Sequence, residues 1–100
     1  MTHIIKWTED WFRNQCDGYW EHSNRIIIES LDNPGWSVKI DLMDTKIAHL
    51  DIKYNLYERK ENDWYGFSVK DSLFHGVGDP GKLEFLLLKF RELVELGELV

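Results

Sequence analysis

Leu31-Asp32-Asn33-Pro34-Gly35-Trp36 separates two stretches that both have the residue pattern of a β-strand. Pro34 is favoured at the second position of a tight turn, and Gly35 can take the positive φ that a type II turn requires next. Upstream, Arg25–Leu31 contains three consecutive Ile, and downstream Trp36–Leu42 alternates apolar and polar residues. The stretch therefore predicts a type II hairpin turn between two antiparallel strands.

Further segments with a period of two follow this hairpin. Leu50–Tyr57 and Trp64–Lys70 alternate apolar and polar residues, which is typical of strands with one solvated face. The polar run Glu58–Asp63 between them predicts a solvated hairpin loop. A short fifth strand is expected over Leu73–Val77.

Both ends of the chain have the spacing of three and four that marks an amphipathic helix. The N-terminal pattern predicts a helix from residue 2 or 3 to residue 16 or 17, just before Gly18. For the C-terminal helix, Asp79 is the predicted N-cap, Pro80 the first helical residue and Gly97 the end. The apolar stripes consist of Ile4, Trp7, Trp11 and Phe12 in the first helix and Leu83, Leu86, Leu87, Phe90, Leu93, Val94 and Leu96 in the second.

The order of these elements predicts an α+β fold. Because no long crossover segments separate the strands, neighbours are expected to pair antiparallel. We expect a single antiparallel sheet of four to five strands in a meander, with the N-terminal and C-terminal helices packed on one face. The length suits one domain, over residues 1–100.

Composition and charge exclude several classes of protein. No stretch approaches the roughly 18 apolar residues of a membrane span, and the N-terminus lacks the features of a secretory signal. A lone cysteine, Cys16, agrees with a reducing compartment, so a cytoplasmic protein is expected. The net charge of −6 disfavours nucleic-acid binding and favours a basic partner protein.

The segment between the first helix and the first strand holds the candidate catalytic groups. Cys16 and His22 are a conceivable nucleophile and base, and Asp17 and Glu21 add carboxylates for a small enzyme or metal-dependent hydrolase. The competing interpretation is structural, since Cys is often buried and Asp often caps turns. No spacing among these residues matches a metal motif, so neither a metal nor a cofactor is predicted.

Five Trp residues could supply anchors for a partner protein. Trp7, Trp11 and Trp36 occupy apolar positions of their elements and are expected in the core. Trp20 lies in a predicted loop and Trp64 on the off-phase of a strand, so both are expected to be exposed.

Several stretches together resemble the immunity protein 53 family of bacterial polymorphic toxin systems. The resemblance lies in the N-terminal tryptophan helix, in Cys16-Asp17-Gly18-Tyr19-Trp20-Glu21-His22-Ser23, in Leu31–Leu42, in Asp63-Trp64 and in Gly76-Val77-Gly78 before the leucine-rich helix. It implies a cytoplasmic, non-enzymatic antidote that binds and neutralises a cognate toxin. The acidic surface favours a basic toxin, such as a nuclease domain.

On this interpretation a set of acidic, aromatic and polar residues forms the toxin-binding site. These residues are Asp17, Trp20, Glu21, His22, Asp32, Asn33, Asp63 and Trp64. Two alternatives remain open: the small enzyme built on Cys16, Asp17, Glu21 and His22, and a module whose Trp and Leu stripes face a second copy of the chain. A monomer or a weak dimer is expected.

Overall fold

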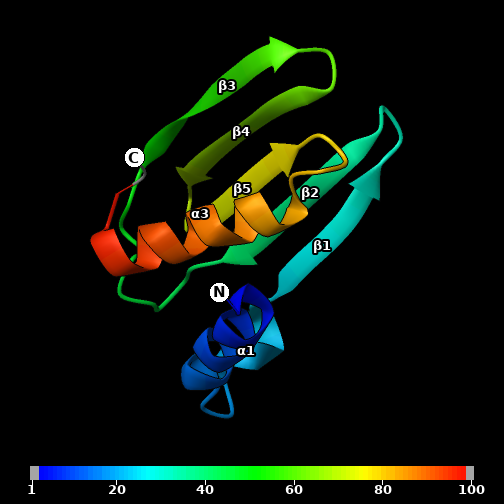
Figure 1. The fold of residues 1–100 in the computed structure, drawn as a ribbon. Helices are drawn as coiled ribbons and strands as arrows, with labels where there is room; N and C mark the ends of the chain where they lie inside the picture. Colours follow the sequence, from blue (N-terminus) through cyan, green and yellow to red (C-terminus); the bar gives the residue numbers. More distant parts are fainter. Residues whose placement is uncertain (1–2, 99–100) are drawn as a thin grey trace.

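The computed structural model describes residues 3–98. Its centre is one antiparallel five-stranded sheet (Figure 1). This sheet, together with the helices at both ends of the chain, confirms the predicted α+β class. The elements in chain order are α1 (Ile4–Gln15), α2 (Trp20–Ser23), β1 (Ile26–Leu31), β2 (Gly35–Asp41), β3 (Ile52–Lys60), β4 (Asp63–Lys70), β5 (Leu73–Gly78) and α3 (Leu83–Leu96). The predicted start of the first helix at residue 2 lies outside the described residues. The predicted loop over Glu58–Asp63 is shorter than expected, because β3 extends to Lys60 and β4 begins at Asp63.

The strand order β1-β2-β5-β4-β3 corrects the predicted meander at one connection. The β1–β2, β3–β4 and β4–β5 pairs are hairpins of neighbouring strands, but β5 inserts between β2 and β4. Residues 42–51 carry the chain past the β4–β5 turn to the far edge. There the Leu42 N–H donates to the Ser72 carbonyl (2.7 Å), and the Ser72 hydroxyl donates to the Ala48 carbonyl (3.0 Å).

The physical reason for this order lies in the composition of the two strands. β5 is buried at every second position and carries Phe74, which suits a central strand beneath a helix. β3 is exposed from Lys53 to Lys60, and its charged residues suit an edge, where they discourage pairing with another chain. Period-two patterns predict both strands equally well but say nothing about which one is central.

The β1–β2 hairpin is confirmed, with Leu31 paired to Gly35, but its turn is not of type II. The Asn33–Pro34 peptide is cis, which places Pro34 at the third position of a type VI turn, and Gly35 has no positive φ. The glycine is explained instead by a close approach. A Cβ on Gly35 would lie 2.5 Å from the carbonyl oxygen of Gly78 and 3.2 Å from the Trp64 ring.

The hydrophobic core lies between the sheet and α3. α3 contacts β5 and β2, and α1 contacts α3. Phe90 of α3 is the meeting point, since its ring centroid lies 4.8 Å from that of Trp11, 5.3 Å from that of Phe74 and 6.0 Å from that of Trp7. Trp11 is buried as predicted, whereas Trp7 and Trp36 are only half-buried at the border of the core.

The ends of the long helices were predicted with mixed success. α3 ends as predicted, since Gly97 has φ +75° and its N–H donates to the Leu93 carbonyl (2.8 Å). Its predicted start is wrong, because the helix begins at Leu83 with Lys82 in the N-cap position. The Asp79 carboxylate is instead engaged with β4 and with Lys82, so it stabilises the turn before the helix.

Candidate partner-binding site

The eight residues predicted to bind a partner fall into two groups at opposite ends of the sheet. Asp17, Trp20, Glu21 and His22 lie just before β1, at what we call the α2 end (residues 16–24 and 42–44). Asp32, Asn33, Asp63 and Trp64 lie at the hairpin-tip end, formed by the β1–β2 turn, the β3–β4 turn and the β5–α3 loop. Because β1 runs from one group to the other, the eight residues do not form one surface.

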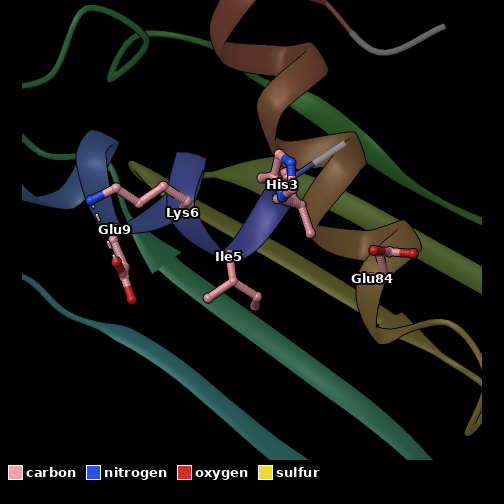
Figure 2. A pocket seen from close by; sticks show the side chains of 6 residues that line it. His3, Ile5, Lys6, Glu9 and Glu84 are labelled. Carbon is pink, nitrogen blue, oxygen red and sulfur yellow. Dashed lines mark ion pairs between the residues drawn. The ribbon is translucent and has the colours of Figure 1, made fainter. Parts of the chain in front are cut away.

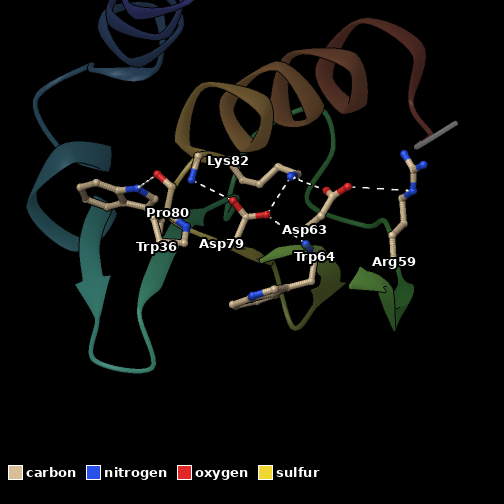
Figure 3. Close-up of polar contacts among 8 residues, drawn as sticks. Trp36, Arg59, Asp63, Trp64, Asp79, Pro80 and Lys82 are labelled. Atoms are coloured by element: carbon tan, nitrogen blue, oxygen red, sulfur yellow. Dashed lines mark hydrogen bonds and ion pairs between the residues drawn. The ribbon is translucent and has the colours of Figure 1, made fainter. Parts of the chain in front are cut away.

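Two carboxylates of the hairpin-tip end share one ammonium (Figure 3). Lys82 Nζ lies 2.7 Å from Asp79 Oδ2 and 2.8 Å from Asp63 Oδ1. The Trp64 N–H donates to Asp79 Oδ2 (2.9 Å) and the Gly81 N–H to Asp79 Oδ1 (2.8 Å). Asp79 is only 4% exposed, so this network fixes the start of α3 to the start of β4.

The contacts of this network shift the pKa of each of its groups. Hydrogen bonds to Asp63 and Asp79 raise the pKa of Lys82. The hydrogen bond from Lys82 lowers the pKa of Asp63. Burial acts to raise the pKa of Asp79, but hydrogen bonds from Lys82 and two backbone N–H groups outweigh it, so this pKa is lowered. All three groups stay charged near neutral pH, and their charges are largely satisfied inside the protein.

A hollow of about 520 Å³ opens beside this network. Its lining residues are Asn33, Pro34, Lys60, Glu61, Asn62, Trp64 and Pro80. Trp64 is half-buried against Gly35, so its predicted exposure is only partial, while Asp32 and Asn33 are exposed as part of the turn. The Trp36 indole N–H donates to the Pro80 carbonyl (2.9 Å) and so joins β2 to the β5–α3 loop at this end of the sheet (Figure 3).

At the α2 end, the carboxylates of Asp17 and Glu21 both accept hydrogen bonds from backbone N–H groups. Asp17 Oδ1 accepts from the N–H groups of Tyr19 and Trp20 at 2.9 Å. Glu21 carboxylate oxygens accept from the N–H groups of Asp17 (3.1 Å) and Gly18 (3.0 Å). These bonds satisfy N–H groups of the connector and of the first residue of α2, which helps to explain why this short helix forms where the sequence predicted a loop.

Trp20 is buried, which corrects the prediction that it is exposed. Only 6% of its surface is accessible, and its ring packs edge-on against Trp11 and Phe12. Its indole N–H donates to the carbonyl of Met43 (2.6 Å), which lies 23 positions further along the chain. Trp20 therefore ties α2 to the segment after β2 and is not available as a contact residue.

Two exposed side chains that the sequence analysis did not single out stand next to Trp20. Tyr19 is 83% exposed and Met43 is 54% exposed. Together they flank a hollow of about 470 Å³, which is lined by Gln15, Asp17, Tyr19, Trp20, Ser23, Asn24, Met43 and Asp44. The sequence does give one indication that Tyr19 is exposed, since this aromatic residue follows Gly18 in a polar connector. No comparable feature of the sequence indicates that Met43 is exposed.

The geometry of Cys16 works against the enzyme alternative. Its thiol donates to the Phe12 carbonyl (3.3 Å) of its own helix. Burial, and secondly the carboxylates of Glu21 and Asp17, raise the pKa of Cys16. A cysteine nucleophile is usually activated by a lowered pKa or by an adjacent base, so a raised pKa disfavours the reactive thiolate. His22 is exposed on α2.

A second pair of possible catalytic groups lies in the sheet. Ser37 Oγ and His75 Nε2 are 3.1 Å apart on the neighbouring strands β2 and β5. Ser37 is only 3% exposed, so its hydroxyl is not accessible to a substrate. Burial, and secondly the charge of Lys39, lower the pKa of His75. This hydrogen bond is best explained as a cross-strand contact.

A further hollow, of about 400 Å³, lies between the first turns of α1 and α3 (Figure 2). Ile5 is 59% exposed there, and Lys6 pairs with Glu9 and Asp10 on its own helix. These ion pairs are solvent-exposed and contribute little to stability.

Within residues 3–98, no group of three or more His, Cys, Asp or Glu side chains is placed to hold a metal ion, and no helix is long and apolar enough to cross a membrane.

Comparison with protein families identifies the chain. The model of one family, described as Immunity protein 53, matches residues 5–95. The chain belongs to the immunity protein 53 family. The match begins at the second residue of α1, includes α2 and every strand and extends into the last turn of α3, so both ends of the sheet lie within it. Comparison with curated proteins and with solved structures gives no match.

Membership of the immunity protein 53 family confirms the predicted resemblance and points to a toxin-neutralising role. Such a role needs a surface for a protein partner, and it requires no catalytic group of the chain's own. The α2 end and the hairpin-tip end are the two parts of the described structure that combine a hollow with residues from the predicted binding set.

Proposed function

We propose that this chain is an antidote that binds a cognate polymorphic toxin directly and blocks its action in the cytoplasm. The observation that carries the proposal is the family match over residues 5–95. The surroundings of Cys16 and the burial of Ser37 support a binding role over catalysis. The protein acts as one domain, as a monomer or a weak dimer.

The charge of the chain supports a basic toxin, such as a nuclease domain. A net charge of −6 attracts a positively charged partner over distances of about one Debye length and speeds the encounter. Exposed aromatic residues then supply the contact energy, since interface hot spots are enriched in Trp, Tyr and Arg. Both ends of the sheet remain candidates for this contact.

The direct test uses the toxin domain encoded beside the gene for this chain. The purified chain is expected to bind this domain in a calorimetric titration, and its co-expression is expected to rescue cells that express the toxin. Absence of both binding and rescue would rule out the proposal. Mass measurement in solution checks the monomer, since a tight dimer at micromolar concentration would point to the alternative of a module whose Trp and Leu stripes face a second copy of the chain.

A pair of variants separates binding from catalysis. Cys16→Ser and His22→Ala remove the only thiol and the imidazole of the enzyme alternative. Because Cys16 bonds to its own helix and His22 is exposed, both variants are expected to fold, and any change in protection is expected to follow the change in toxin affinity. Loss of protection by a folded variant that still binds the toxin would instead support catalysis.

A further inference from the structure

We infer that the toxin contacts the hollow at the α2 end and that a basic segment of the toxin enters it. This inference rests on the proposed function and specifies its surface. We call the site the Tyr19–Met43 surface; it consists of the eight residues that line the hollow, Gln15, Asp17, Tyr19, Trp20, Ser23, Asn24, Met43 and Asp44.

The main chain at Tyr19 is held in place while its ring projects into solvent. The Tyr19 N–H donates to Asp17 Oδ1 (2.9 Å), and the Tyr19 carbonyl accepts from the His22 N–H (3.1 Å). Tyr19 is 83% exposed, the largest value among the exposed large hydrophobic residues of the part of the chain that the structure describes. A tyrosine fixed in this way loses little conformational entropy on binding, which favours its use as an anchor.

Met43 is held by Trp20, whose own N–H shares the Asp17 carboxylate oxygen with the N–H of Tyr19. The buried Trp20 indole donates to the Met43 carbonyl (2.6 Å), while the Trp20 N–H is bonded to Asp17 (2.9 Å). Asn24 strengthens this arrangement, since its side chain donates to the Trp20 carbonyl (2.9 Å). Trp20 therefore links the main chain at Met43 to the carboxylate that also binds the main chain at Tyr19, so it is a positioning residue rather than a contact residue.

The charge of the hollow selects a cationic occupant. Asp17 and Asp44 are exposed at its rim, and none of the described residues that line it is Lys or Arg. The nearest lysine along the chain from Asp44, Lys46, lines a neighbouring hollow instead. Asp17 keeps its charge because the N–H groups of Trp20 and Tyr19 lower its pKa. An aromatic ring beside carboxylates suits a Lys or Arg side chain, which can stack on the ring and pair with the acids.

The hairpin-tip end offers less to a basic partner. Its two most enclosed carboxylates, Asp63 and Asp79, are already neutralised by Lys82. The hollow beside them contains Lys60 next to Glu61, so the charges that line it are balanced. Charge complementarity therefore favours the α2 end.

The first experiment measures the affinity of the adjacent-gene toxin domain for Tyr19→Ala. Truncation of a central anchor typically costs enough for a loss of affinity of about 30-fold or more, and this is the expected result. The matched control is Tyr54→Ala, which removes another exposed tyrosine (51% exposed) from the edge strand β3 and is expected to change affinity less than about twofold.

The second experiment tests the charge of the occupant. The double variant Asp17→Asn/Asp44→Asn keeps the capping oxygen of residue 17 and the left-handed backbone at residue 44 (φ +61°), since Asn tolerates both. It is expected to slow association about threefold to tenfold at low salt and to flatten its salt dependence. Asp32→Asn/Glu61→Gln makes the same change in net charge at the hairpin-tip end and is expected to have a smaller effect.

The outcomes separate this inference from the proposed function. If wild-type protein binds the toxin but Tyr19→Ala binds equally well, the surface is wrong and the antidote role stands. A larger loss in Tyr54→Ala, or a larger salt effect in the hairpin-tip double variant, likewise places the interface elsewhere. Failure of the wild-type chain to bind overturns both proposals.

Discussion

Replacing Lys82 with Met tests how much the shared ammonium stabilises the fold. Met keeps the methylene packing over Gly78, where a Cβ would lie 2.7 Å from Lys82 Cβ, and removes only the charge. The side chains of Asp79 and Lys82 are 5% and 19% exposed, and breaking a buried pair of this kind costs about 3–5 kcal/mol. Asp79 keeps two backbone donors, so we expect a loss of about 2–3 kcal/mol in the free energy of unfolding.

The pH dependence of this loss follows from the direction of each pKa shift. The lowered pKa values of Asp63 and Asp79 give stability that is present above the ordinary carboxyl pKa of about 4 and is lost as pH falls through the lowered values. The raised pKa of Lys82 gives stability that is present below about pH 10.4 and is lost as pH rises through the raised value. The difference between wild type and variant should therefore be constant from about pH 5 to 9 and shrink on both sides.

Urea unfolding followed by tryptophan fluorescence gives the two free energies, and the exposed pair of α1 provides the control. Lys6→Met removes an ammonium of similar reach whose side chain is 60% exposed, and it is expected to cost less than about 0.5 kcal/mol. A loss below about 1 kcal/mol in Lys82→Met, or a difference that does not change with pH, would refute the reasoning about the buried network.

Three further substitutions test the local arguments by the same unfolding assay. Gly35→Ala should cost about 1–3 kcal/mol because its Cβ would press on the Gly78 carbonyl, and an unchanged midpoint would contradict the close approach. Trp20→Phe keeps an aromatic ring but loses the hydrogen bond to Met43, so we expect a loss of about 1 kcal/mol together with weaker toxin binding; full affinity would argue against Trp20 as a positioning residue. Gly97→Ala places a side chain at φ +75° and should cost about 1 kcal/mol, and no effect would mean that the last turn frays.

The eight predicted site residues, which the structure divides into two groups, illustrate what sequence reasoning can and cannot supply. The structural interpretation of Asp17, as a residue that caps a turn, is supported by its bonds to Tyr19 and Trp20. The predicted exposure of Trp20 is wrong because its burial depends on the Met43 carbonyl, and no local pattern links positions so far apart. Tyr19 was not singled out because exposure of a loop residue depends on which neighbours turn inward.

The elements that depend on local chemistry can be predicted from the residue pattern alone. The alternation in β2 and β4, the apolar stripes of α1 and α3 and the glycine end of α3 all follow from contacts within a few residues of each position. These patterns were enough to predict an α+β domain with an antiparallel sheet.

Only the tertiary structure decided how these elements are arranged. Periodicity shows that a face is covered but not what covers it, so the insertion of β5 between β2 and β4 was not predictable from the strand patterns. The same holds for Asp79, which has the sequence signature of an N-cap yet bonds to β4 and Lys82. The hollow between Tyr19 and Met43 likewise exists only because the chain returns past α2 after β2. Contacts between distant residues fix all three features, because they bring together groups that the local sequence leaves independent.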